Sequence, residues 1–265
     1  YKRQALLVES GMWTCLRERP YDKVATVGSE LPRDLFVSIA DTNPLAVNPD
    51  VIIKQHEEEF KTGLEVLSKL CTRHLYVCQL DGQDTKLPAI KNLKQETFSG
   101  LHPAGNVGTH MHHLSPPHMK NRVWYVGYQD VMAIGHLFMT GKRMQTRYVG
   151  LGGPMAKKPR VLRTCVGADL SVLVEGETKE GDVRVASGSV LNGRKMEGPF
   201  GYLGAFHNQV SLIAEGKERK LLGWHMPGFD QYSVKRVFAS KLLGRSRFPM
   251  SASTHGSKRA LVPFG

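Results

Sequence analysis

The stretch Leu35-Phe36-Val37-Ser38-Ile39-Ala40, followed at once by Asp41-Thr42-Asn43-Pro44, decides the fold class. Its first six residues form an almost continuous apolar run, which is typical of a strand buried on both faces of a parallel sheet. The polar residues that follow predict a sharp turn at the carboxyl end of this strand. Ligands of open parallel sheets bind beside such ends, so Asp41 and Asn43 are candidates for ligand contact as well as for capping the turn.

Helical and strand patterns alternate after this turn. Asn48-Pro49-Asp50 predicts the start of a helix, and an apolar face continues that helix to Leu70. A second apolar run, residues 75–80, predicts a parallel strand that is reached by a right-handed crossover. The other elements expected in this part of the chain are helices over residues 2–19 and 130–140 and strands over residues 123–126 and 147–151.

The pattern changes beyond Gly152-Gly153-Pro154, where short β-type segments between glycine-rich turns replace the alternation. Together with a helical piece over residues 169–174, they predict a smaller α+β domain. The strands expected there are residues 160–166, 183–186, 209–214 and 220–225. We therefore expect an α/β domain over residues 1–153, an α+β domain over 154–226 and an irregular basic segment over 227–265.

Composition and charge exclude several classes of protein. With 265 residues, 41% of them hydrophobic, the chain can bury a core, which excludes disordered and collagen-like proteins. No apolar stretch approaches the ~20 residues that a membrane-spanning helix needs. The net charge of +12 suits nucleic acid, anionic lipid or an acidic partner, and also a surface that binds nothing in particular. Because the basic residues are dispersed, we expect no nucleic-acid partner.

Familiar cofactor and catalytic motifs do not fit. The nearest imitation of a dinucleotide-binding loop, Gly150-Leu151-Gly152-Gly153-Pro154, is followed by Lys157-Lys158-Pro159, where a helix would be required. A turn at a domain boundary is the favoured interpretation. The Walker lysine motif, the nucleophile elbow and the zincin motif are also missing, so we expect no catalytic residue. The four cysteines lie far apart, which favours a reducing compartment.

Five of the 11 histidines fall between His102 and His118. Such a density raises the question of metal ligation or proton handling. No nearby cysteine or carboxylate completes a ligand set, so we expect no metal. The favoured interpretation is a tight turn that Gly105 and Gly108 permit, leading into a short helix that ends at Pro116-Pro117. A polar wall beside a ligand cleft is the alternative.

The segment Ser99-Gly100-Leu101-His102-Pro103-Ala104-Gly105, with Gly108-Thr109-His110-Met111-His112, resembles the NqrA family, a component of the bacterial Na+-translocating NADH:quinone reductase. His113 and the pair Asn106-Val107 depart from the family pattern. Further matches in the same order are residues 9–13, 17–20, 41–45, 128–131, 158–160, 163–164, 187–191, 198–199, 223–224 and 226–228.

The resemblance implies a Rossmann-like parallel-sheet domain followed by a small α+β domain of the β-grasp, soluble-ligand-binding type. This architecture is similar to that of the flavin- and NADH-binding component of respiratory complex I. The glycine-rich flavin loop of that component is not found here, so we expect no flavin. Family members are longer at both ends, which implies that an N-terminal small β domain and a C-terminal helical segment are missing from this sequence.

The resemblance also implies a function: a peripheral subunit on the cytoplasmic side of the bacterial inner membrane, inactive alone, that contributes to ubiquinone reduction coupled to sodium export. The implied partners are ubiquinone, the membrane subunits of the complex, chiefly NqrB, and an anionic membrane surface. Two alternatives remain, a non-catalytic assembly scaffold and a stand-alone flavin or NAD oxidoreductase. The expected quinone-contacting residues are Asp41, Thr42, Asn43, His102, Thr109 and His110.

Overall fold

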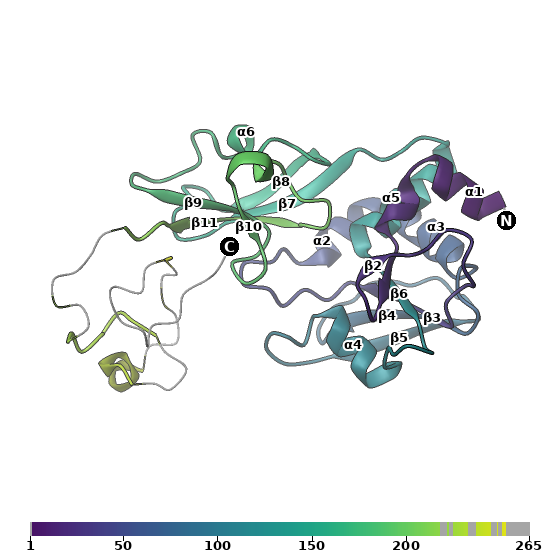
Figure 1. Cartoon of the computed structure of the whole chain (residues 1–265), viewed down its shortest axis with the longest axis horizontal. Coiled ribbons are helices and arrows are strands. Elements are labelled where there is room, and N and C mark those ends of the chain that lie inside the picture. The colour runs from purple at the N-terminus through teal and green to yellow at the C-terminus, as the bar shows by residue number, and fades with distance from the viewer. Residues whose placement is uncertain are drawn as a thin grey trace. The chain divides into compact units, whose positions relative to one another are not determined.

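The chain is a mixed α/β protein with two sheets (Figure 1). The computed structural model describes residues 2–217, 222, 225–232, 237–244, 248 and 251–252. Two compact units share the chain, one of Tyr1–Asn43 and Asn48–Thr146, the other of Pro44–Val47 and Arg147–Gly265. Each unit has its own sheet.

The first unit contains a six-stranded sheet in the order β2-β1-β6-β3-β4-β5. Strands β6, β3, β4 and β5 are parallel, whereas β1 pairs antiparallel with both β2 and β6. The predicted pairing of the two apolar runs is therefore confirmed, with Leu35 opposite Leu75. The strand bounds are β1 Arg17–Arg19, β2 Lys23–Val24, β3 Asp34–Ser38, β4 His74–Leu80, β5 Leu93–Phe98 and β6 Val123–Gly127.

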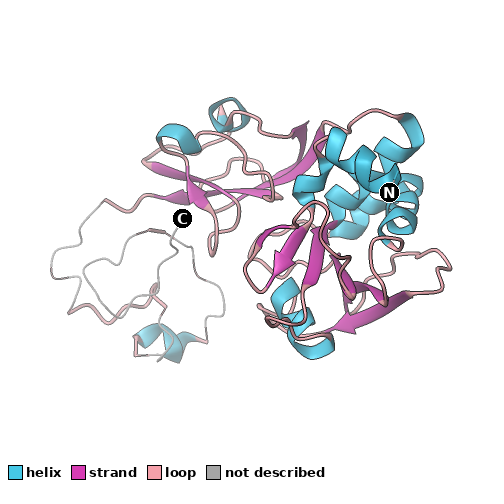
Figure 2. Cartoon of the chain, turned by 45° about the vertical axis from the view of Figure 1, so that its right-hand side comes forward, coloured by secondary structure: helices cyan, strands magenta, loops and turns pink. Residues whose placement is uncertain are grey.

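Helices cover both faces of this sheet, with α4 on one side and α3 and α5 on the other (Figures 1 and 2). Because side chains alternate along a strand, Phe36 of β3 faces α4 and packs in one cluster with Met111 of that helix. Both side chains are fully buried, and for Phe36 the apolar run of β3 predicted this. The helix bounds are α1 Lys2–Glu9, α2 Pro49–Ile53, α3 Glu57–Leu67, α4 Val107–Leu114 and α5 Tyr128–Thr140.

The expected helix over residues 2–19 is wrong beyond Glu9. The chain turns at Gly11, whose φ is 73°, then forms a 3-10 turn over Met12–Cys15 and strand β1. Tertiary contacts outweigh the helical apolar period here, because Trp13 packs edge-on against Trp124 with ring centroids 5.6 Å apart. Its indole Nε1–H also donates to the carbonyl of Ala25, at 2.6 Å.

Two further expectations for this unit need adjustment. The long helix after Asn48 is divided by a 3-10 turn, Lys54–His56, into α2 and α3. Strand β5 was not expected, since its sequence, Leu-Lys-Gln-Glu-Thr-Phe, has neither an apolar run nor a clear alternation. It is an edge strand, which takes its position from backbone pairing with β4 rather than from burial.

The second unit contains a five-stranded sheet in the order β10-β9-β11-β7-β8. Strand β11 is parallel to β7 and antiparallel to β9, and β9 is antiparallel to β10. A short helix, α6 Leu170–Val174, begins at Asp169, whose carboxylate accepts a hydrogen bond from the amide of Ser171 at 2.8 Å. The strand bounds are β7 Thr146–Gly152, β8 Arg160–Cys165, β9 Val183–Ser187, β10 Arg194–Lys195 and β11 Gln209–Ala214.

Most of the elements expected in this unit are present. The strands predicted over residues 160–166, 183–186 and 209–214 correspond to β8, β9 and β11. The strand expected over residues 220–225 lies largely outside the described residues, as does much of the segment over 227–265. Among the described residues, no helix combines the length and apolar character that crossing a bilayer demands.

Candidate functional site

The sheet of the first unit has a point at which its strand order reverses. From β3 the chain proceeds to β4 and β5 on one side, whereas β6 lies on the other side of β3. The connections at the carboxyl ends of β3 and β6 therefore diverge, and open α/β sheets hold their ligands in the space this creates. Asp41, Thr42 and Asn43 follow β3 at this point, so the structure places them where the sequence predicted a binding loop.

Asp41 and Asn43 form a closed polar turn. One carboxylate oxygen of Asp41, Oδ1, accepts hydrogen bonds from the backbone amide of Asn43 at 2.9 Å and from its side-chain Nδ2 at 2.8 Å. Asp41 thus caps the turn, which is one of the two roles that the sequence suggested for it. The side-chain oxygen of Asn43, Oδ1, is buried and has no partner among the described residues, which leaves one acceptor unused.

Thr42 connects the loop after β3 to the loop after β5. Its hydroxyl oxygen accepts from the amide of Gly105 at 2.9 Å and lies 3.3 Å from Nδ1 of His102. Since the oxygen already accepts one bond, its hydrogen is free to point at Nδ1. The same oxygen can also accept a second bond, so the contact fits either neutral tautomer of His102. The structure therefore brings Thr42 and His102, two of the predicted site residues, into direct contact.

Thr109 and His110 of α4 bond back to the same loop. The Thr109 hydroxyl donates to the carbonyl of Pro103 at 2.9 Å, and Nε2 of His110 donates to the carbonyl of Ala104 at 2.8 Å. The His110 ring is fully buried and lies 4.2 Å from the Phe98 ring, centroid to centroid. These two side chains fix the loop after β5, and their donor groups are occupied by it.

The protonation state of His110 follows from its surroundings. Burial lowers the pKa of His110 below its ordinary value, and the neighbouring His113 lowers it further, against the opposing effect of the bond to Ala104. A carbonyl only accepts, so Nε2 carries the proton and Nδ1 of the neutral ring is an acceptor. Nδ1 is buried and has no partner among the described residues.

Two acceptor atoms at this edge have no hydrogen-bond partner among the described residues. They are Oδ1 of Asn43 and Nδ1 of His110, and both atoms are buried. Sequence reasoning assigned all six residues to ligand contact, but most of their hydrogen bonds hold the two loops together. It also missed Gly105 and Phe98 as parts of this arrangement, although the glycine was recognised as a turn residue.

The next feature is the arrangement of the side chains that could bind a metal ion. Across the described ranges, no group of three or more His, Cys, Asp or Glu side chains is arranged to hold a metal ion. Histidines 110 and 113 share α4, but the Nε2 of His110 is engaged with a backbone carbonyl. The histidine-rich segment forms a turn and a short helix that ends before Pro116, as predicted, but Gly108 lies inside the helix rather than in the turn.

Fold and site together define a mixed α/β protein whose parallel sheet presents polar loops at its switch point, a class with many ligand-binding members. Residues 2–143 match the family model described as the NqrA second alpha/beta domain. Residues 148–198 match the model described as the NQRA C-terminal domain. The chain belongs to the NqrA family.

Curated relatives agree with the family models. The NqrA subunit of the Na(+)-translocating NADH-quinone reductase of Alcanivorax borkumensis is 50% identical over 264 residues, which cover 99% of this chain and 58% of the relative. The protein of the same name from Marinomonas sp. is 47% identical over 259 residues, covering 98% and 58%. The chain thus spans less than two thirds of the length of these relatives.

A solved structure is similar in fold. A chain in the crystal structure of the NAD+-reducing [NiFe]-hydrogenase in the H2-reduced state aligns with a TM-score of 0.53 and 11% sequence identity. The alignment covers 80% of this chain and 47% of that chain. At this identity, the likeness concerns the fold alone and carries no cofactor or activity to the present chain.

Proposed function

We propose that the chain is part of an NqrA subunit that contributes to ubiquinone reduction, coupled to sodium export, in a Na+-translocating NADH:ubiquinone oxidoreductase. Membership of the NqrA family carries this proposal. The names of the relatives describe them as subunits of an NADH-quinone reductase that translocates sodium ions. In this proposal the chain holds no flavin or metal and is inactive by itself, since it supplies a binding surface rather than a redox centre.

The proposed architecture is a Rossmann-like domain followed by a β-grasp-like domain. The parallel strand order β5-β4-β3-β6 corresponds to the first four strands of the doubly wound order, which supports the first assignment. A short helix beside a mixed sheet supports the second. Domain boundaries at residues 153 and 226 stay predictions.

The quinone would bind at the carboxyl edge of the first sheet. Reduction turns each carbonyl oxygen of a quinone into a hydroxyl, so a site that serves both forms needs donors and acceptors. In the tautomer with its proton on Nε2, His102 would donate to a quinone carbonyl, and its contact with Thr42 would orient the imidazole ring. Asp41 and Asn43 supply acceptors for the hydroxyls of the quinol. Thr109 and His110 act by holding the loop rather than by touching the ring.

One observation favours the scaffold alternative. The hydrogen bonds of Thr42, Thr109 and His110 stay within the two loops, which is also what a rigid assembly surface would need. A stand-alone flavin or NAD oxidoreductase has less support, because the loop after β3 contains Asp-Thr-Asn-Pro in place of a glycine-rich phosphate loop.

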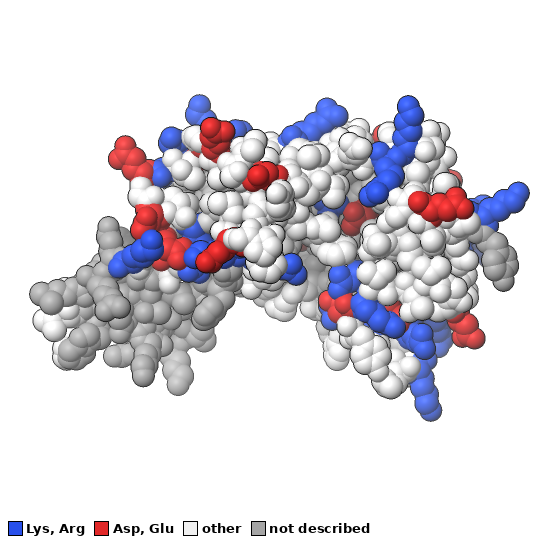
Figure 3. Space-filling model, turned by 45° about the horizontal axis from the view of Figure 1, so that its top comes forward, with Lys and Arg blue, Asp and Glu red and all other residues white. Residues whose placement is uncertain are grey.

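The partners and location follow from the same proposal. The protein would sit on the cytoplasmic side of the bacterial inner membrane and bind the membrane subunits of the complex, chiefly NqrB. The net charge of +12 would assist docking beside an anionic membrane surface. On the face drawn in Figure 3, basic side chains are spread over much of the surface with acidic ones among them, and several basic ones adjoin at the lower right.

The proposal is tested in the whole complex, with His102→Ala and Thr42→Val introduced into the full-length protein. Both changes should raise the KM for a short-chain ubiquinone by about tenfold, because His102→Ala removes a hydrogen-bonding group at the quinone and Thr42→Val removes the hydroxyl that orients His102. His112→Ala, on the exposed face of α4, is the matched control and should leave KM unchanged. Normal assembly with an unchanged KM in both variants would favour the scaffold instead.

A further inference from the structure

The opposite edge of the same sheet contains a cavity that the quinone proposal does not use. Its volume is about 830 Å³, within the range of small-molecule sites. The loops before β3, β4 and β6 form its walls, so it lies at the amino ends of these strands. The lining residues are Ser29, Glu30, Leu31, Pro32, Arg33, Thr72, His118, Met119, Lys120, Asn121 and Arg122.

The wall of this cavity carries more positive than negative charge. Arg33, Lys120 and Arg122 are exposed cations on its wall, and Glu30 is the only carboxylate among the lining residues. Within the part of the chain that the structure describes, none of these three cations forms an ion pair. Cations gathered around a concave surface reinforce one another's potential, because the protein wall keeps part of the screening water away.

Neutral donors add to the cations. Nδ1 of His118 accepts a hydrogen bond from the amide of Lys120 at 3.3 Å, which assigns the proton of the neutral ring to Nε2. His118 is exposed on the cavity wall, so this N–H is available to a ligand. Guanidinium groups bind phosphate oxygens in a bidentate manner, and an ammonium group suits phosphate as a point charge.

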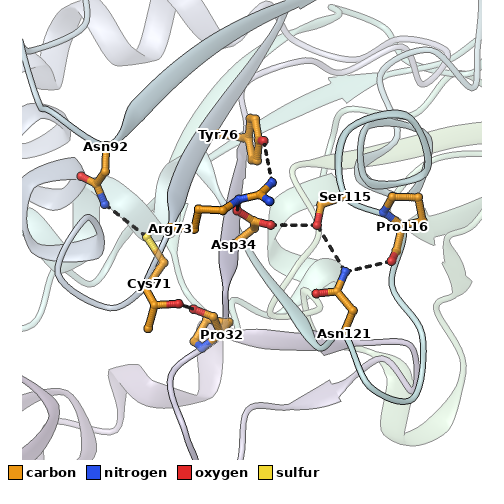
Figure 4. Close-up of polar contacts among 10 residues, drawn as sticks. Pro32, Asp34, Cys71, Arg73, Tyr76, Asn92, Ser115, Pro116 and Asn121 are labelled. Carbon is orange, nitrogen blue, oxygen red and sulfur yellow. Dashed lines mark hydrogen bonds and ion pairs between the residues drawn. The ribbon is translucent and has the colours of Figure 1, made fainter.

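A buried polar network holds the wall in place (Figure 4). Asp34, which is fully buried, accepts from Nε of Arg73 at 3.1 Å and from the hydroxyl of Ser115 at 2.8 Å. Asn121 of the wall donates to the Ser115 hydroxyl at 3.3 Å and to the carbonyl of Pro116 at 2.9 Å. The segment that carries Lys120 and Arg122 is thereby attached to the core of the sheet.

We propose that this cavity binds a phosphate group, with Arg33, Lys120, Arg122 and His118 as its donors. The phosphate belongs either to a small soluble phosphate compound or to the headgroup of an anionic phospholipid. The site is independent of the proposed quinone site, because it lies at the other edge of the sheet and shares no residue with it.

The test is a calorimetric titration of the chain with inorganic pyrophosphate. Binding should be saturable and should weaken by about tenfold or more in the double variant Arg33→Ala/Arg122→Ala, since charge-assisted bonds are the strong ones. The control, Lys94→Ala/Arg163→Ala, removes the same charge from exposed positions outside the cavity and should bind like the wild type. Circular dichroism establishes that both variants fold.

A second arm identifies the source of the phosphate. Vesicles of phosphatidylglycerol in phosphatidylcholine that displace pyrophosphate from the wild-type chain would assign a lipid headgroup, whereas pyrophosphate binding that vesicles do not disturb would assign a soluble compound. No binding of pyrophosphate or vesicles would overturn the proposal. So would equal weakening in the cavity and control variants, or binding of a polyglutamate peptide alone, which would point to an acidic protein partner.

Discussion

At Gly105 the loop after β5 comes very close to Thr42 in the loop after β3. A Cβ at this position would lie 2.6 Å from the backbone nitrogen of Thr42 and 2.9 Å from its hydroxyl oxygen. No side chain fits at these distances without moving the backbone of one loop. The geometry of the candidate site therefore depends on a residue that makes no contact with the proposed ligand through a side chain.

We expect Gly105→Ala to destabilise the chain by about 1–3 kcal/mol, because overpacking forces the two loops apart. Gly108→Ala is the matched control, since a Cβ there meets nothing within 4 Å and alanine favours the helix. It should be neutral or stabilising. Urea unfolding of both variants measures the difference, and equal stabilities would show that the loops do not meet at Gly105.

His110 should make the stability of the chain depend on pH. Burial lowers the pKa of His110 in the folded state, so the unfolded state takes up a proton more readily as the pH falls through about 6.5. The free energy of unfolding is therefore highest above this pH and decreases below it. Burial likewise lowers the pKa of His207, so that residue contributes to the same decrease.

The variant His110→Gln should show a smaller loss of stability than the wild type when the pH is lowered from about 7 to about 5. His112→Gln, an exposed change on the same helix, should retain the full dependence. Urea unfolding at several pH values gives the slope for each protein. A slope in His110→Gln as steep as that of the wild type would mean that His110 is protonated with equal ease in both states.

At the level of single residues, the sequence predicted positions better than roles. Asp41, Thr42 and Asn43 lie at the switch point because they follow a strand that could be recognised from its apolar run. Their hydrogen-bond partners could not be predicted, since the contact between Thr42 and His102 joins residues that are 60 positions apart. Whether they bind a quinone stays a prediction.

At the scale of the elements, α3 and α5 cross at a very short distance. A Cβ on Gly135 of α5 would lie 1.7 Å from the carbonyl oxygen of Glu59, and one on Gly63 of α3 would lie 2.1 Å from the carbonyl oxygen of Val131. The two helices thus cross through paired glycines, backbone against backbone. This contact anchors the helical layer on the face of the sheet opposite α4.

Gly135→Ala should therefore lower the free energy of unfolding by about 3 kcal/mol or more, because the added methyl group meets rigid backbone on the neighbouring helix. Gly108→Ala in α4 is again the control, because it adds the same methyl group to a helix at a position with open space around it. Thermal unfolding followed by circular dichroism is the measurement. A loss below about 1 kcal/mol would contradict the close crossing of α3 and α5.

The elements with a strong apolar signal were predicted, and those set by pairing were not. The runs that became β3 and β4 are buried on both faces, so composition alone identifies them. By contrast, β1 and β5 are held by hydrogen bonds to a neighbouring strand, and nothing in their own residues requires a strand. The start of α2 was predictable because the Asn48 side chain caps it, accepting from the amide of Asp50.

For the whole molecule, family membership is stronger evidence of function than any sequence motif. The match to two family models extends over both units, although the chain spans only 58% of the length of its Alcanivorax relative. The activity of the complete complex therefore cannot be assigned to this chain alone. Quinone binding, by contrast, can be measured on the chain itself.

The most direct test is a calorimetric titration of the chain with a short-chain ubiquinone. We expect saturable binding that weakens by about tenfold in His102→Ala, through loss of a hydrogen bond to the quinone, and that is unchanged in His112→Ala. The absence of saturable binding, or the same affinity in all three proteins, would contradict a quinone site at the carboxyl edge of the first sheet.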